Sequence, residues 1–393
     1  MNQVEKYLSR YAEPEARQSD FHNQAPNQFD HVLVIPAYSE TLAEVTRTWQ
    51  ALEGNFLVIV VVNSPEPDEA TEQLAQDLAK ESLPNVMVID RFSESRRIPP
   101  RQGVGLARKV GCDVALSLIA AGVVRDSWIF TTDADVTLPA DYFEIPKRLL
   151  SKSAAAVFPF RHVAEAAYAD ACQAYELSML YYAAGIRWAE SKYAYTTIGS
   201  TLAFSANHYA GVRGFPKRNT GEDFYLLNKL RKSAPITSLE GPMITISGRV
   251  SERVPIGTGR AIEKINASGE TASIEHPDCY VALKEVLSWM KDLAARQTVT
   301  PKLQDRTSEQ ILDAFGFFEH YENKRAQSPS QAVMEKHLTD WFDALKTRQF
   351  IHRARDLQYG LVPITDPGPI PFAPSATNIE MLHRACRKRV FGA

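Results

Sequence analysis

Several features that would mark a specialised class of protein are missing from this sequence of 393 residues. The formal net charge is −3 and the pI is about 6.3, and no long run of lysine or arginine occurs. Proteins that bind nucleic acid usually present a basic surface to the phosphates. We therefore expect no nucleic acid partner.

Long apolar runs are also missing. The longest one near the middle of the chain, residues 114–124, is shorter than the roughly 20 residues that a membrane-spanning helix needs, and Arg125 and Asp126 follow it. Residues 1–7 contain no apolar stretch that resembles a secretion signal. These absences predict a protein without a transmembrane segment and with a cytoplasmic location.

Cysteine is scarce. The four cysteines are far apart in the chain and show none of the close pairings of zinc or redox motifs: they are Cys112, Cys172, Cys279 and Cys386. We expect reduced thiols, mostly buried, and no disulfide framework.

The composition is that of an ordinary globular protein, with 45% hydrophobic and 23% charged residues. A chain of this length is more than one hydrophobic core usually supports, so we expect a large domain and a smaller addition. Residues 1–28 are polar and are expected to form a lead-in rather than core. Residues 29–258 are expected to form the main domain, and residues 259–393 a mainly helical region.

Buried strands and helices alternate through the first part of the chain. Apolar runs that suit strands buried on both faces occur at residues 32–35, 56–62, 86–89 and 128–132, and helical patterns at 41–52, 68–80 and 105–121. Further strands are expected at 154–158 and 201–205, and helices at 164–191, 221–231, 279–295, 308–321 and 330–351. The pattern predicts an open α/β sheet, in which ligands bind at the carboxyl ends of the strands. Pro36, Asn63 and Asp133 occupy such ends.

Asp133 and Asp135 follow the fourth predicted strand directly. Two carboxylates this close oppose each other's ionisation unless a cation or water offsets their charge. A hard cation such as Mg²⁺ takes one or two protein carboxylates and completes its shell with water and phosphate oxygens. On its own, however, an Asp-x-Asp pair fits a solvated strand end better, by roughly four to one.

Further motifs surround this pair in a fixed order. Pro36-Ala-Tyr-Ser-Glu40 follows the first strand, Asn63 follows the second, and a Gly-x-Gly-x-Ala-Arg run ending at Arg108 precedes Asp133-Ala-Asp135. Thr220-Gly-Glu-Asp223 comes later. In this order the motifs resemble those of the family 2 glycosyltransferases of the GT-A fold, over approximately residues 30–255. The resemblance implies an open, mixed nucleotide-sugar-binding sheet.

The resemblance also assigns roles on the donor side of the reaction. The turn from Pro36 through Ala37 and Tyr38 to Glu40 would hold the nucleobase and ribose, and Asn63 would contact the base where many relatives have aspartate. Arg101 and Arg108 are candidates for binding the diphosphate or shaping its loop. In the Asp133-Ala134-Asp135 motif, Asp133 would lie near the ribose, and Asp135 is the better candidate for ligating Mg²⁺ or Mn²⁺.

On the acceptor side, Asp223 would take the proton from the acceptor hydroxyl, with Glu222 as the fallback or an orienting group. Both acids equally suit a helix N-terminus, where they would complement the helix dipole. A Gly- and Arg-rich segment, residues 247–260, is expected to form a lid over the diphosphate. No histidine occurs between His208 and His276, so the third metal ligand stays unassigned. Lys109 is expected on a solvated helix face.

These features together predict a metal-dependent glycosyltransferase that uses a nucleoside-diphosphate sugar, and the family expectation is inversion. The acceptor stays open between a small molecule, a glycan and a lipid-linked compound, and the C-terminal helices could support a homo-oligomer. Two alternatives remain. Asp133-Ala-Asp-Val-Thr137 also fits the nucleophile motif of haloacid-dehalogenase-like phosphohydrolases. The other alternative is a protein that binds a nucleotide sugar without catalysis.

Overall fold

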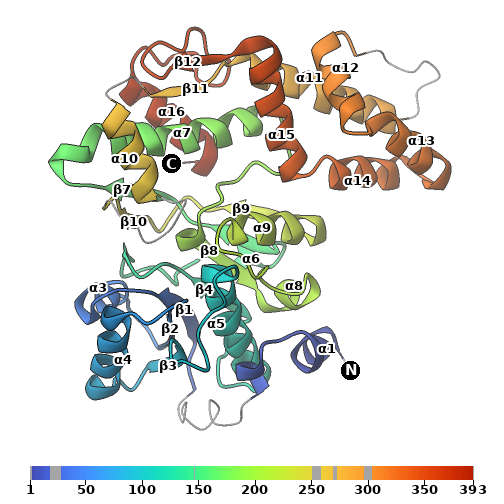
Figure 1. Cartoon of the computed structure of the whole chain (residues 1–393). Coiled ribbons are helices and arrows are strands. Elements are labelled where there is room, and N and C mark those ends of the chain that lie inside the picture. Colours follow the sequence, from blue (N-terminus) through green and yellow to red (C-terminus); the bar gives the residue numbers. More distant parts are fainter. Residues whose placement is uncertain are drawn as a thin grey trace. The chain divides into compact units, whose positions relative to one another are not determined.

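The computed structural model describes residues 2–17, 28–145, 147–249, 258–268, 272–295 and 303–392. Its contacts divide the chain into two compact units (Figure 1). Unit 1 contains Met1–Val163 and Thr197–Ser247, and unit 2 contains Ala164–Thr196 and Gly248–Ala393. The division differs from the expected boundaries, because residues 164–196 group with the C-terminal residues rather than with the sheet.

Unit 1 is built around a seven-stranded sheet with the order β3-β2-β1-β4-β8-β6-β9. The strands are β1 (His31–Ala37), β2 (Phe56–Asn63), β3 (Val86–Arg91), β4 (Trp128–Thr131), β6 (Ala155–Val157), β8 (Leu202–Ser205) and β9 (Ile236–Ser238). The pairs from β3 to β4 are parallel, β8 is antiparallel to both β4 and β6, and β9 is parallel to β6. The predicted α/β fold with a mixed open sheet is confirmed.

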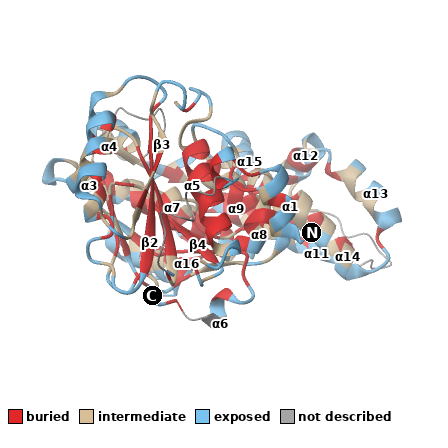
Figure 2. Cartoon of the chain, turned by 90° about the horizontal axis from the view of Figure 1, so that it is seen from below, coloured by how far each residue is buried: buried red, intermediate tan, exposed pale blue. Residues whose placement is uncertain are grey.

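The central strands are apolar because both faces of the sheet are covered. All eight residues of β2 are buried, as expected for a strand between two helical layers. Helix α4 (Glu69–Glu81) packs on one face of β2, and α5 (Gly103–Ala120) packs on the other (Figure 2). Asp68 caps α4 as its sequence position predicts, because its side chain accepts a hydrogen bond from the Thr71 N–H at 2.7 Å.

Strand β1 continues one residue beyond the proline that was expected to end it. Proline lacks the N–H that a strand donates to its neighbour. The carbonyl of Val34 accepts a hydrogen bond from the Thr132 N–H, on the β4 side of the strand. The backbone N–H and C=O groups of alternate residues point to the same neighbouring strand, so those of residues 34 and 36 point the same way. The missing N–H of Pro36 therefore faces the side where pairing with β4 has already ended at Val34.

A second, three-stranded sheet holds the segment after the aspartates. It contains β5 (Val136–Thr137), β10 (Ile244–Ser247) and β7 (Phe160–Val163), in that order. The Ser247 N–H continues the pairing by donating to the carbonyl oxygen of Asp135 at 3.2 Å. Both ends of the Asp133–Asp135 segment are therefore attached to a sheet.

The N-terminal residues differ from the lead-in that their polarity predicted. They form α1 (Gln3–Arg10) and η1 (Pro14–Arg17), which pack against α5. Tyr7 is 1% exposed, and Ala12 and Ala16 are buried. The remaining helices of unit 1 are α3 (Leu42–Arg47), α6 (Lys147–Leu150), η3 (Gly199–Thr201), α8 (Ala206–Gly211) and α9 (Glu222–Ser233).

Unit 2 is mainly helical, as expected for the C-terminal region. It contains η2 (Ala166–Tyr168), α7 (Ala169–Trp188), α10 (Thr258–Ser268), α11 (Asp278–Ala294), α12 (Arg306–Ala314), α13 (Phe317–Gln327), α14 (Gln331–Trp341), α15 (Ala344–Ala354), η4 (Arg355–Tyr359) and α16 (Ile379–Phe391), with β11 (Ser273–Glu275) and β12 (Leu361–Pro363) paired antiparallel. Buried Glu176 on α7 joins α16 through His383 at 2.7 Å and Arg387 at 2.5 Å. Tyr181, Tyr280 and Phe372 pack together in its core.

Within the described ranges, every helix is too short or too polar to span a bilayer. All four cysteines are buried free thiols, as predicted.

Candidate functional site

Arg108 lies at the centre of the candidate site. Its side chain is only 2% exposed, and every nitrogen of the guanidinium donates to a protein oxygen. Nε donates to Glu222 Oε1 at 3.0 Å, and Nη1 donates to Thr131 Oγ1 at 3.1 Å and to the Thr132 carbonyl at 3.3 Å. Nη2 donates to Asp133 Oδ1. One side chain of α5 therefore connects the end of β4 with the start of α9.

The loop that carries the two aspartates is anchored between them. Ala134 is buried, and its carbonyl accepts a hydrogen bond from Thr48 Oγ1 at 3.1 Å. Thr132, just before the loop, donates through Oγ1 to the Ser200 carbonyl at 2.8 Å. With Ala134 turned inward, Asp133 and Asp135 are each partly exposed, and the Asp133 side chain is 37% exposed. The two carboxylates can therefore be reached by a ligand.

Two glycines allow the close contacts around Arg108. A Cβ atom on Gly199 would lie 2.5 Å from Arg108 Nη2, and a Cβ atom on Gly105 would lie 2.5 Å from the Pro216 carbonyl. The Gly105 N–H donates to the Arg218 carbonyl at 3.0 Å. A side chain at either position would push η3 or the segment before α9 away from α5. The Gly-x-Gly-x-Ala-Arg run thus lets the start of α9, with Glu222 and Asp223, approach Arg108.

Helix α9 starts with the two acids of the later motif. Gly221 caps it with a φ of +70°, a conformation that suits glycine. Glu222 is buried, and Asp223 is partly buried with Oδ1 accepting from the Phe224 N–H at 2.7 Å. Burial raises the pKa of Glu222, although Arg108 opposes the shift. Burial and then the neighbouring Glu222 raise the pKa of Asp223 to about 7.

The charges around Arg108 do not balance. We define the Arg108 cluster as Arg108, Asp133, Glu222 and Asp223, which contains three carboxylates and one guanidinium. Like charges held close together oppose full ionisation, so the cluster retains a proton more readily than separate acids would. A carboxyl that titrates near neutral pH at a partly exposed position is suited to accept a proton in a reaction.

The turn after β1 and the end of β2 are joined by an amide. Asn63 Nδ2 donates to the carbonyls of Ala37 and Val61, both at 3.0 Å. Pro36 and Ala37 are buried in β1, Tyr38 is partly buried, and Glu40 is 6% exposed. The donors of Asn63 thus hold the ends of the two strands together.

The two candidate arginines occupy different surroundings. Arg101 is exposed just ahead of α5, and it makes no hydrogen bond or ion pair with the residues that the structure describes. Arg108 is buried with all its nitrogens engaged. Of the two roles expected for Arg108, its contacts fit shaping the loop rather than direct contact with a diphosphate.

The donor set for a metal is small. Nowhere in the described part of the chain do three or more His, Cys, Asp or Glu side chains gather in a way that could hold a metal ion. Asp133 already shares one oxygen with Arg108, and Asp135 is partly exposed. These residues fit a Mg²⁺ or Mn²⁺ site that water and substrate phosphates would complete. The expected lid cannot be compared, since residues 250–257 lie outside the described residues.

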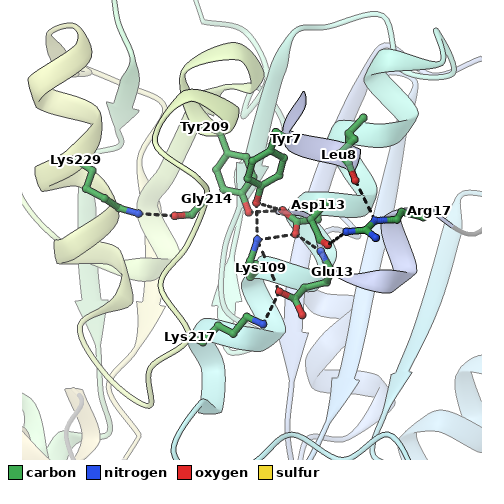
Figure 3. Close-up of polar contacts among 11 residues, drawn as sticks. Tyr7, Leu8, Glu13, Arg17, Lys109, Asp113, Tyr209, Gly214, Lys217 and Lys229 are labelled. Atoms are coloured by element: carbon green, nitrogen blue, oxygen red, sulfur yellow. Dashed lines mark hydrogen bonds and ion pairs between the residues drawn. The ribbon is translucent and has the colours of Figure 1, made fainter. Parts of the chain in front are cut away.

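Lys109 corrects the expectation of a solvated helix face. It is 4% exposed, and its Nζ donates to Tyr7 Oη at 2.5 Å and to Asp113 Oδ2 at 2.8 Å (Figure 3). The spacing of Lys109 and Asp113, four residues apart on a helix, was a signal for this pair. The sequence did not predict Thr131 and Thr132 as partners of Arg108, because nothing in their sequence context distinguishes them from other strand residues.

No protein-family model and no curated protein matches this sequence. Among solved structures, the chain is similar to residues 1–349 of S. aureus TarS in complex with UDP-GlcNAc, with a TM-score of 0.38 and 13% identity, covering 91% of each chain. It is also similar to GalNAc-T7 with UDP, GalNAc and Mn²⁺, with a TM-score of 0.38 and 9% identity, covering 71% of this chain and 53% of that chain. Similarities this weak support no inference about activity.

Proposed function

We propose that this chain is a glycosyltransferase that moves a sugar from a nucleoside-diphosphate sugar to an acceptor hydroxyl. The observation that supports the proposal most is the Arg108 cluster. One buried guanidinium holds Asp133, from the motif that resembles a donor site, and Glu222, from the motif that resembles an acceptor site. These two acids, 89 residues apart in the chain, therefore lie together near the carboxyl ends of the parallel strands, where α/β proteins bind ligands.

On the donor side, Asp135 and Asp133 would hold Mg²⁺ or Mn²⁺. When bound, such an ion offsets the charge that develops on the departing nucleoside diphosphate. The anchored loop presents both carboxylates at the surface, and Arg108 fixes the rotamer of Asp133. The turn of Ala37, Tyr38 and Glu40 with Asn63 would hold the nucleobase and ribose, since it lies at the same edge of the sheet.

On the acceptor side, Asp223 would accept the proton of the attacking hydroxyl. A base works best when its pKa lies near the working pH, because it is then both ionised and able to take a proton. The pKa of about 7 meets this condition. Glu222 is held by Arg108 and keeps Asp223 in a negative environment. A base opposite the leaving group corresponds to inversion at the anomeric carbon.

The test is a screen of UDP-, GDP- and dTDP-sugars with Mn²⁺, in which release of the nucleoside diphosphate is measured. We expect turnover of at least one donor, which depends on the metal and is abolished in Asp135→Ala. The matched control is Asp141→Ala, which removes an exposed aspartate from the segment just beyond β5 and should keep full turnover. Equal turnover in Asp135→Ala and wild type would overturn the assignment.

The same preparations distinguish the two alternatives. Hydrolysis of p-nitrophenyl phosphate without any sugar nucleotide, lost in Asp133→Asn, would instead identify a phosphohydrolase. Binding of a nucleoside diphosphate without turnover, unchanged in Asp223→Asn, would identify a binding protein.

A further inference from the structure

We propose that Arg108 is a positioning residue that couples the donor half of the site to the acceptor half, so that nucleoside-diphosphate affinity depends on Glu222. This inference rests on the proposed function, because it concerns the same site. It assigns to Arg108 a role through Asp133 and Glu222 rather than direct contact with substrate.

The contacts of Arg108 leave it little freedom to adopt another arrangement. Its guanidinium donates four hydrogen bonds to four different residues, and its side chain is almost fully buried. Gly199 lies against Nη2 so closely that even a Cβ atom would collide with it. The guanidinium therefore stays in place. A change at one of the two acids can alter only the strength of the interaction between Arg108 and the other acid.

The two acids differ in how a ligand can reach them. The Asp133 side chain is 37% exposed, whereas that of Glu222 is 6% exposed. A ligand or metal ion at the donor side can therefore reach Asp133, but it meets a carboxylate already held by Arg108. Glu222 is out of a ligand's reach, and its hydrogen-bonded connection to Asp133 runs through the guanidinium.

This arrangement sets the direction of the coupling. Glu222 offsets part of the positive charge of Arg108 through its bond to Nε. If Glu222 is made neutral, the same charge is offset mainly by Asp133, which then is held more strongly and is less available to a cation–diphosphate complex. Neutralising Glu222 should therefore weaken nucleoside-diphosphate binding, although Glu222 is not a donor ligand.

Arginine suits this role better than lysine. Its planar fork presents Nε and Nη2 to different acceptors at fixed angles, whereas an ammonium group is a single point charge on a flexible stem. A lysine at position 108 could neutralise one acid but could not hold both at once.

The test is a double-mutant cycle on binding, measured by calorimetry with Mn²⁺ and whichever of UDP, GDP and dTDP binds the wild type. The four proteins are the wild type, Glu222→Gln, Arg108→Met and the double variant. We expect Glu222→Gln to weaken binding about fivefold or more in the wild-type background, which is the lower range of energetic coupling between sites. With Arg108→Met, the same change should alter affinity less than about twofold.

Two further variants keep the test interpretable. Arg108→Lys preserves the charge if Arg108→Met does not fold, and it should reduce the effect of Glu222→Gln on affinity to below about twofold. Lys109→Met removes the neighbouring buried cation of α5, and in that background the full effect of Glu222→Gln should remain. Circular dichroism checks that each variant is folded.

The outcomes separate this inference from the proposed function. If none of the three nucleoside diphosphates binds the wild type, the proposed function fails and the coupling fails with it. If one binds but Glu222→Gln leaves its affinity unchanged, or weakens it equally with and without Arg108, only the coupling role of Arg108 is overturned.

Discussion

Arg108 and Lys109 are consecutive residues of α5, and both are buried, yet their cationic groups join very different clusters. We define the Lys109 cluster as Lys109, Asp113, Glu13, Lys217, Tyr7 and Tyr209 (Figure 3). In it, two ammonium groups face two carboxylates. In the Arg108 cluster, one guanidinium faces three carboxylates.

Hydrogen bonding differs between the clusters as well as charge. Asp113 is fully buried and accepts from Tyr7 Oη at 2.6 Å, Tyr209 Oη at 2.9 Å, the Glu13 N–H at 2.8 Å and Lys109 Nζ at 2.8 Å. Both of its oxygens are thus engaged. These bonds tie the N-terminal segment and α8 to α5. A balanced, saturated cluster of this kind leaves nothing for a ligand to complete.

The Arg108 cluster differs from this in charge and in exposure. It carries excess negative charge, and Asp133 and Asp223 reach partly exposed positions. Such an arrangement costs stability unless a cation or a proton joins it, and the proposed transfer would supply both. The contrast suggests a distinction between the two ionic clusters on α5: one is balanced in charge and closed to a ligand, and the other carries excess negative charge at partly exposed positions.

The largest expected effect is on turnover in Asp223→Asn. An amide cannot accept the proton of the acceptor hydroxyl, and a general base contributes about 10²- to 10⁴-fold to a rate. Transfer from the donor found in the screen should fall by a factor in this range, while affinity for the nucleoside diphosphate is retained. A loss of less than about tenfold would show that Asp223 is not the base.

Asp113→Asn, in the Lys109 cluster, should lower stability rather than turnover. It removes the nearer charge partner of buried Lys109 and leaves Glu13 at 3.9 Å, so the free energy of unfolding should fall by about 3–5 kcal/mol. Urea denaturation measures this loss. Nucleoside-diphosphate affinity of the folded protein should stay within about twofold of wild type. A large loss of affinity without a loss of stability would show that the Lys109 cluster also contributes to ligand binding.

Tyr7→Phe tests how much the N-terminal segment depends on a single hydroxyl. This hydroxyl donates to Asp113 and accepts from Lys109. A hydrogen bond to a charged group contributes about 1.5–3 kcal/mol, so we expect urea denaturation to show a loss in that range. The rate of donor turnover should not change. Unaltered stability would mean that the segment is held mainly by its apolar contacts.

The last expected effect is a gain in stability from Asp223→Asn at high pH. Because the folded-state pKa of Asp223 is raised to about 7, the folded protein holds this proton more tightly than the unfolded chain does. Stability from this group is therefore complete below about pH 4 and is lost as the pH rises through 7.

Asp223→Asn removes that loss, so its melting temperature should match wild type at pH 4 and exceed it at pH 8. Each 1 kcal/mol gained in the free energy of unfolding raises the melting temperature by about 2–4 °C in a domain of this size. Thermal denaturation at the two pH values measures it. A variant that is less stable than wild type at pH 8 would show that ionised Asp223 is stabilised rather than opposed by its surroundings.

Much of the sheet could be predicted because its strands are continuous apolar runs. Residues 56–62 read as buried on both faces, and the structure places Phe56–Asn63 in the centre of the parallel region. The position of Asp133 directly after a strand was predictable for the same reason. Periodicity and chain order contain this information, since they concern neighbouring residues.

The partners of buried cations could not be predicted in this way. Arg108 and Glu222 are 114 residues apart, and Lys109 and Tyr7 are 102 apart, so no local pattern connects them. Tyr7 lies in a polar segment whose composition suggested exposure. Residues 164–196 group with the C-terminal residues, and an aromatic helix shows that it is buried but not against which part of the chain.

The most direct test of the Arg108 cluster as the site of transfer is the pH dependence of kcat/KM for the donor found in the screen. A base with a pKa of about 7 must be ionised to work, so kcat/KM should rise tenfold per pH unit below 7 and level off above it. Asp223→Asn should show only residual turnover without this rise. A wild-type profile that is flat between pH 5 and 9, or that falls as the pH rises through 7, would contradict the assignment.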